Sequence, residues 1–60
     1  MKAIFECYEE PMDKLEVQTQ TYTVRLTSKP NCNEESSVVL DKKAVVGLIQ
    51  VLAECLYELE

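Results

Sequence analysis

The chain has no histidine and no tryptophan, and its 60 residues include one glycine, two prolines and one phenylalanine. Without histidine it lacks the side chain that most often acts as a general acid or base near neutral pH. The single glycine, Gly47, excludes a glycine-rich phosphate-binding loop. No serine stands in a G-x-S-x-G sequence. These absences argue against an enzyme, and no catalytic or cofactor-binding residue is predicted.

The chain has only three cysteines that could pair or bind a metal, and Cys7, Cys32 and Cys55 lie far apart. An odd number of thiols without a CxxC pair or a histidine excludes a four-ligand zinc site within one chain, so no metal site is predicted. The first ten residues lack the apolar stretch of a signal peptide, so we expect a cytoplasmic protein with three free thiols. Cys7 and Cys55 lie on apolar faces of their segments, which predicts that both are small core residues.

Basic residues are few, six against eleven acidic ones, which gives a net charge of −5. Non-specific affinity for nucleic acids comes mostly from lysine and arginine contacts to phosphates, so no nucleic-acid partner is expected. No apolar run reaches the ~18 residues of a membrane span, so no membrane association is expected either. An acidic chain of this kind suits a small soluble protein that binds another protein.

The first forty residues favour extended structure. Lys2–Glu9 alternates between apolar and polar residues, which predicts a strand, and Pro11 and Asp13 mark the turn after it. Leu15–Ser28 is rich in threonine and valine and predicts a second strand, while Ser36–Leu40 predicts a short third one. A three-stranded antiparallel meander is therefore expected.

The phase of the second predicted strand is irregular. Leu15 and Val17 are apolar at odd positions, whereas Tyr22, Val24 and Leu26 are apolar at even positions. A regular strand cannot place both sets on one face. Either a β-bulge near residues 18–21 shifts the phase, or the two ends bury opposite faces. A tight hairpin is less favoured, because no glycine or proline lies in the run.

The last segment predicts a helix that begins after Asp41, which suits an N-cap. In the window 44–59 only four residues are not apolar: Gly47, Gln50, Glu54 and Glu58. A helical period groups one set of residues into a main stripe: Val45, Leu48, Ile49, Leu52, Leu56 and Leu59. Ala44, Val51 and Cys55 widen this stripe on one flank. Val46, Ala53 and Tyr57 form a second strip on the other flank.

A surface helix needs an apolar stripe only about 100° wide, so this helix has apolar surface to spare. A single small domain, residues 1–60, is expected to bury only ~60% of its unfolded-chain surface, which favours pairing with a second copy. We predict a β-β-β-α fold of the α+β class, dimerised through the helix. The predicted interaction residues flank or belong to the second strip: Val46, Gly47, Gln50, Ala53, Glu54 and Tyr57.

Charge on the helix favours an antiparallel pair. Glu54 and Glu58 are like charges near the helix C-terminus, where the helix dipole also disfavours them. An antiparallel partner helix would place its Lys42 and Lys43 beside them.

The favoured function is a non-catalytic protein–protein interaction module, a small regulator or inhibitor that acts as a homodimer. Two alternatives remain open. One is a β-ribbon nucleic-acid-binding protein that presents residues 18–23 to a groove. The other is a small subunit of a larger enzyme complex, with the extra apolar helix surface docked on a larger chain.

Overall fold

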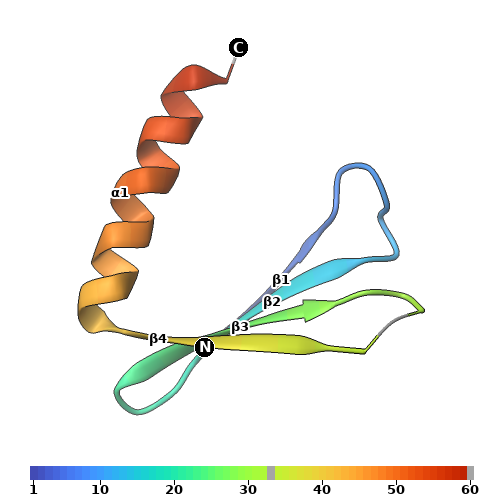
Figure 1. Cartoon of the computed structure of the whole chain (residues 1–60), viewed down its shortest axis with the longest axis horizontal. Helices are drawn as coiled ribbons and strands as arrows, with labels where there is room; N and C mark the ends of the chain where they lie inside the picture. Colours follow the sequence, from blue (N-terminus) through green and yellow to red (C-terminus); the bar gives the residue numbers. More distant parts are fainter. Residues whose placement is uncertain (33, 60) are drawn as a thin grey trace.

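The chain folds into a four-stranded antiparallel sheet followed by one helix, in a computed structural model that describes residues 1–32 and 34–59 (Figure 1). The elements are β1 (Lys2–Glu6), β2 (Lys14–Thr19), β3 (Thr23–Lys29), β4 (Ser36–Asp41) and α1 (Lys42–Glu58). The strand order is β1-β2-β3-β4, so each strand pairs with its neighbour in sequence. The α+β class is confirmed, whereas the predicted number of three strands is wrong.

The error lies in the segment 15–28, which forms two strands joined by a tight hairpin. The Gln20 amide donates to the Thr23 carbonyl at 2.8 Å, and the Thr23 hydroxyl donates to Gln20 Oε1 at 3.0 Å. No described residue has a positive φ, so this turn forms without glycine. The side-chain and backbone bonds between Gln20 and Thr23 stabilise it instead.

This hairpin also explains the irregular phase. Val17 pairs with Leu26, and Thr19 pairs with Val24, so odd positions of β2 lie opposite even positions of β3. Directly paired residues share a face of an antiparallel sheet. The two apolar sets therefore lie on the same face, and neither a bulge nor a change of buried face is needed.

The register gives the sheet one apolar face and one polar face. The apolar face has contributions from all four strands: Ala3, Phe5, Leu15, Val17, Val24, Leu26, Val38 and Leu40. Charged and hydroxyl side chains dominate the other face, although Ile4 and Val39 also lie there. β1 ends at Glu6, earlier than the predicted Glu9, because residues 7–13 form a loop that the Cys7 amide closes by donating to the Asp13 carbonyl at 2.9 Å.

The start of α1 is as predicted. Asp41 is extended, with φ −81° and ψ 177°, and its Oδ1 accepts from the Ala44 amide at 2.9 Å. This satisfies one of the free amides of the first helical turn. Because β4 ends at Asp41 itself, the chain passes from sheet to helix without a linker.

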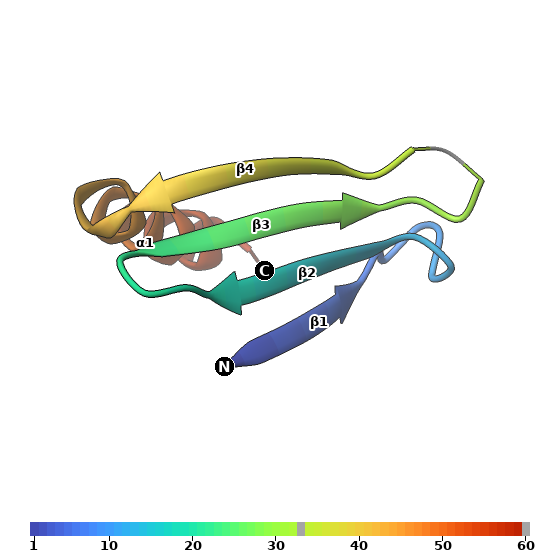
Figure 2. The same ribbon diagram turned by 90° about the horizontal axis from the view of Figure 1, so that it is seen from below.

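Figure 1 shows α1 rising from the end of β4 and leaning away from the sheet, so that the two form an open V. Figure 2, seen from below, places α1 behind the sheet. Within residues 1–32 and 34–59, α1 contacts only β4 and β3. No hydrophobic side chain among these described residues is fully buried. The isolated chain thus has the elements of a domain but lacks a closed core.

Candidate functional site

The inner surface of the V is an apolar groove with two walls. One wall is the apolar face of the sheet, and the other is the main stripe of α1. The walls meet where Val45 and Leu48 of the helix are half-buried, as are Val24 and Leu40 of the strands beneath. Beyond this junction the walls diverge.

The main stripe becomes exposed as the helix leaves the sheet. Leu52 is 57% exposed and Leu56 is 68% exposed, although both continue the line that Val45 and Leu48 begin. The sheet wall is open as well, since Phe5 and Val38 are each more than half exposed. Removal of leucine, phenylalanine and valine side chains from water is favourable, so a partner that covers either wall would stabilise the protein.

Two hollows lie along this groove. An open hollow of 610 Å³ lies at the junction, between the β2–β3 hairpin and the first turn of α1, with Val24, Leu40 and Val45 in its lining. A second hollow of 340 Å³ lies at the other end of the apolar face, where Phe5 and Leu15 contribute to it. The sheet wall is therefore hollowed at both ends rather than closed by its own helix.

The size of the exposed surface supports the same interpretation. The chain exposes 5440 Å². A folded monomer of its 6.9 kDa mass would expose about 4,000 Å². Its radius of gyration is 12.7 Å, whereas a compact domain of this length has about 10 Å. The protomer thus has about 1,400 Å² of surface beyond that of a closed domain of this mass.

The predicted interaction residues lie together on α1, and one of them, Val46, also lines the hollow at the junction with the sheet. Val46, Gln50, Ala53, Glu54 and Tyr57 are all exposed, and Gly47 is half-buried. A Cβ atom built on Gly47 would meet nothing within 4 Å among the described residues. Within the protomer no other described backbone therefore lies close to this glycine, and a close approach would need a partner.

The sequence did not identify the apolar sheet face as the other half of this groove. Its signal was present in the alternation of Leu15 with Val17 and of Val24 with Leu26. It was misread because the hairpin at Gln20–Thr23 was not recognised. Of the main stripe, the sheet covers only the first turns, at Val45 and Leu48.

The predicted burial of Cys7 and Cys55 is wrong for the isolated chain. All three cysteines are free and exposed. Cys7 lies just past the end of β1, and Cys55 lies in the C-terminal half of α1, where the residues are exposed. Neither position has a second layer of structure above it, which is why apolar patterning alone overestimated their burial.

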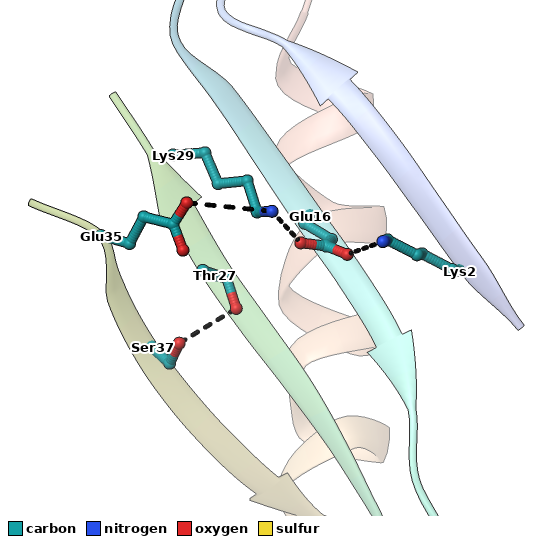
Figure 3. A network of polar contacts seen from close by, with 6 residues as sticks. All are labelled: Lys2, Glu16, Thr27, Lys29, Glu35 and Ser37. Carbon is teal, nitrogen blue, oxygen red and sulfur yellow. Dashed lines mark hydrogen bonds and ion pairs between the residues drawn. The ribbon is translucent and has the colours of Figure 1, made fainter. Parts of the chain in front are cut away.

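The polar face of the sheet carries a cluster of ion pairs that no local sequence pattern indicates (Figure 3). Glu16 bridges two lysines: its Oε1 lies 2.8 Å from Lys2 Nζ and its Oε2 lies 2.8 Å from Lys29 Nζ. The Glu16 side chain is 8% exposed. Next to it, the hydroxyls of Thr27 and Ser37 are 3.0 Å apart and share a hydrogen bond. Figure 3 shows α1 on the far side of the sheet from this cluster.

The two lysines shift the titration of this carboxylate. Hydrogen bonds from Lys2 and then Lys29 hold the pKa of Glu16 below its ordinary value, and the Glu16 partner raises the pKa of Lys29. All charges of the cluster have partners, since Lys29 also lies 3.9 Å from Glu35. The cluster therefore holds β1, β2 and β3 in register, and it offers no free charge for chemistry.

We predict that replacement of Glu16 by glutamine makes the free energy of unfolding less dependent on pH in the acidic range. A pKa lowered in the folded state contributes stability that is present above the ordinary value of 4.5 and is lost as the pH falls through the folded-state pKa. The difference in unfolding free energy between wild type and Glu16→Gln should thus shrink as the pH falls below 4.5. Urea unfolding at several pH values measures this. Glu9→Gln, at an exposed loop position, is the matched control, and an equal pH dependence in both variants would contradict the prediction.

The described part of the chain shows neither a metal-binding cluster nor a membrane-spanning helix. Among residues 1–32 and 34–59 no group of three histidine, cysteine, aspartate or glutamate residues could hold a metal ion. Within the same residues, α1 is neither long enough nor apolar enough to cross a membrane. The groove is the most distinctive surface that the structure describes.

Comparisons with known proteins add no family to this description. No protein-family model, no curated protein and no solved structure matches this chain. The function must therefore be argued from the groove itself.

Proposed function

We propose that this chain is a small, non-catalytic protein–protein interaction module that acts as a homodimer, as a regulator or inhibitor of another protein. The observation that carries the proposal is the open apolar groove between α1 and the sheet. Its walls include Leu52, Leu56 and Phe5, each more than half exposed in the isolated chain. Covering such walls with another protein surface removes apolar side chains from water and therefore lowers the free energy.

The area available fits a homodimer. Burying about 1,400 Å² on each of two protomers would remove about 2,800 Å² in total. Obligate homodimer interfaces bury 2,000–5,000 Å² or more and are more apolar than transient ones. A second copy of this chain supplies the same surplus of exposed surface, which matches the first in area and in apolar character.

Charge supports the same partner. The ion pairs between described residues join the strands and their loops, namely Lys2–Glu16, Lys14–Glu6, Lys29–Glu16 and Lys29–Glu35. The helix charges Lys42, Lys43, Glu54 and Glu58 take no part in these four pairs. In an antiparallel pair of helices, the lysines of one copy would lie near the glutamates of the other, so a second copy provides charges of opposite sign.

The nucleic-acid alternative gains nothing from the fold. Gln18 and Thr19 end β2, and Thr23 begins β3, so the segment proposed as a ribbon is the hairpin at one end of the sheet. The basic residues of the polar face include Lys2, Lys14 and Lys29, which are paired with glutamates. Such lysines are poor partners for phosphates.

We predict a dimer at micromolar concentration, with a mass about twice the 6.9 kDa of the chain. Sedimentation velocity from about 0.1 to 100 µM measures it, and the melting temperature should rise with protein concentration because only the folded chain associates. A folded species with the mass of one chain over this whole range, and a constant melting temperature, would refute the homodimer. The groove would then be better explained as the surface by which a small subunit docks on a larger chain.

A further inference from the structure

The groove has a length and a shape that fit one helix. α1 has 17 residues, which gives about 25 Å at 1.5 Å per residue. β3 has seven residues, about 24 Å of extended chain. A helix of the length of α1 thus spans the apolar face of the sheet. The protomer's own helix does not lie along that face, because it leaves the sheet after Leu48.

The two ends of the main stripe of α1 differ in how far the sheet covers them. The main stripe touches its own sheet only at its start, at Val45 and Leu48. Its continuation, at Leu52 and Leu56, points along the same side of the helix but has no sheet beneath it. Within the described residues α1 makes no contact with β1 or β2. The C-terminal half of the stripe and the β1–β2 half of the sheet are therefore both uncovered.

We infer that the two copies of the proposed homodimer exchange these surfaces. The C-terminal half of each α1 lies on the β1–β2 half of the partner's apolar face, and the two helices run antiparallel side by side. This deepens the proposed function and rests on it. The result is a layer of two helices against a layer formed by two sheets.

This arrangement uses each surface of the helix once. The main stripe covers sheet, first its own and then the partner's. The second strip, which includes Val46, Ala53 and Tyr57, lies about 100° around the helix from the main stripe and faces the neighbouring helix. The remaining, polar side of the helix, with Glu54 and Glu58, faces water, near Lys42 and Lys43 of the partner. The ion-pair cluster at Glu16 lies on the outer face of each sheet, away from the helices.

Isotope-filtered NMR on the wild-type protein tests the exchange. Equal amounts of ¹³C-labelled and unlabelled protein are unfolded together and refolded, so that mixed pairs form. We expect nuclear Overhauser effects between the methyls of Leu52 or Leu56 of one chain and the ring of Phe5 or the methyls of Leu15 of the other. Since α1 has no contact with β1 or β2 in its own protomer, such signals identify the partner's sheet.

The outcomes separate the exchange from the homodimer. A dimer whose filtered signals join β4 to β4 instead would overturn the exchange and leave the homodimer standing, paired through the sheet edge. A monomer would overturn both.

A double-mutant cycle gives a second readout on the same contact. Phe5→Ala and Leu56→Ala should be coupled, with effects on the dimer dissociation constant that depart from additivity by more than about twofold. Residues that lie apart without shared partners are additive within that range. Leu56→Ala with Tyr8→Ala is the matched control, because Tyr8 is 98% exposed in the loop after β1. Additive effects for Phe5 and Leu56 would contradict the exchange.

Discussion

Leu52→Ala is expected to lower the free energy of unfolding by about 2–5 kcal/mol, the range found when a buried leucine is emptied. In the isolated chain Leu52 is 57% exposed, and truncation of such a side chain would cost far less. A large loss would therefore show that another surface covers Leu52. Urea unfolding at a fixed protein concentration measures it, because the stability of a dimer depends on concentration.

Met12→Ala is the matched control for this experiment. Met12 is 65% exposed, close to the value for Leu52, but it lies in the loop between β1 and β2. We expect a change within about 0.5 kcal/mol, as for an ordinary surface substitution. Equal and small effects of the two substitutions would mean that the main stripe stays in contact with water, and the groove would then not be a binding surface.

Ala53→Glu is expected to weaken association by several kcal/mol, the cost of an unpaired charge in a dry interface. Ala53 lies in the second strip, next to Glu54, and the main stripe stays intact when it is replaced. The variant should sediment as a smaller species at concentrations where the wild type is paired. Unfolding at lower temperature should follow from the loss of the partner, so the difference from wild type should diminish as the protein concentration rises.

Tyr8→Glu controls for the added negative charge. It makes the same change in net charge at a side chain that is 98% exposed and remote from α1. We expect it to pair as the wild type does. If Ala53→Glu also keeps the wild-type mass and melting temperature, the second strip faces water, and the dimer contact must be sought elsewhere, for instance along the edge strand β4.

The two substitutions report on different faces of one helix. Leu52 tests whether a sheet covers the main stripe, and Ala53 tests whether a second helix lies beside it. A large effect of Leu52→Ala together with no effect of Ala53→Glu would indicate a partner that covers the groove without a neighbouring helix. Such a result, obtained on the purified chain, would keep the homodimer but place its contact between the groove and the partner's sheet rather than between the two helices.

Local patterns in the sequence determined several features of this protein. Asp41 was recognisable as an N-cap because a carboxylate before an apolar helical period satisfies free amides of the first turn, and the structure confirms it. The helical period itself was clear over residues 44–59. The alternation near Phe5 predicted one strand, and the β-favouring residues of Ser36–Leu40 predicted another. These features depend on residues within a few positions of each other, which is why one sequence suffices to find them.

The tertiary structure decided what these local signals could not. The hairpin at Gln20–Thr23 depends on pairing between β2 and β3, so the odd and even apolar sets could be placed on one face only once the register was known. The Glu16 cluster joins Lys2 to Lys29 across three strands, and no local pattern announces it.

The direction of α1 was beyond local patterning as well. It follows from how β4 passes directly into the helix at Asp41, and this leaves the main stripe from Leu52 onward uncovered. The sequence by itself determined that this helix is too apolar for a protein of 60 residues. Only the fold showed that the surplus is one wall of a groove whose other wall is the sheet, because burial depends on the angle between two elements and not on the composition of either.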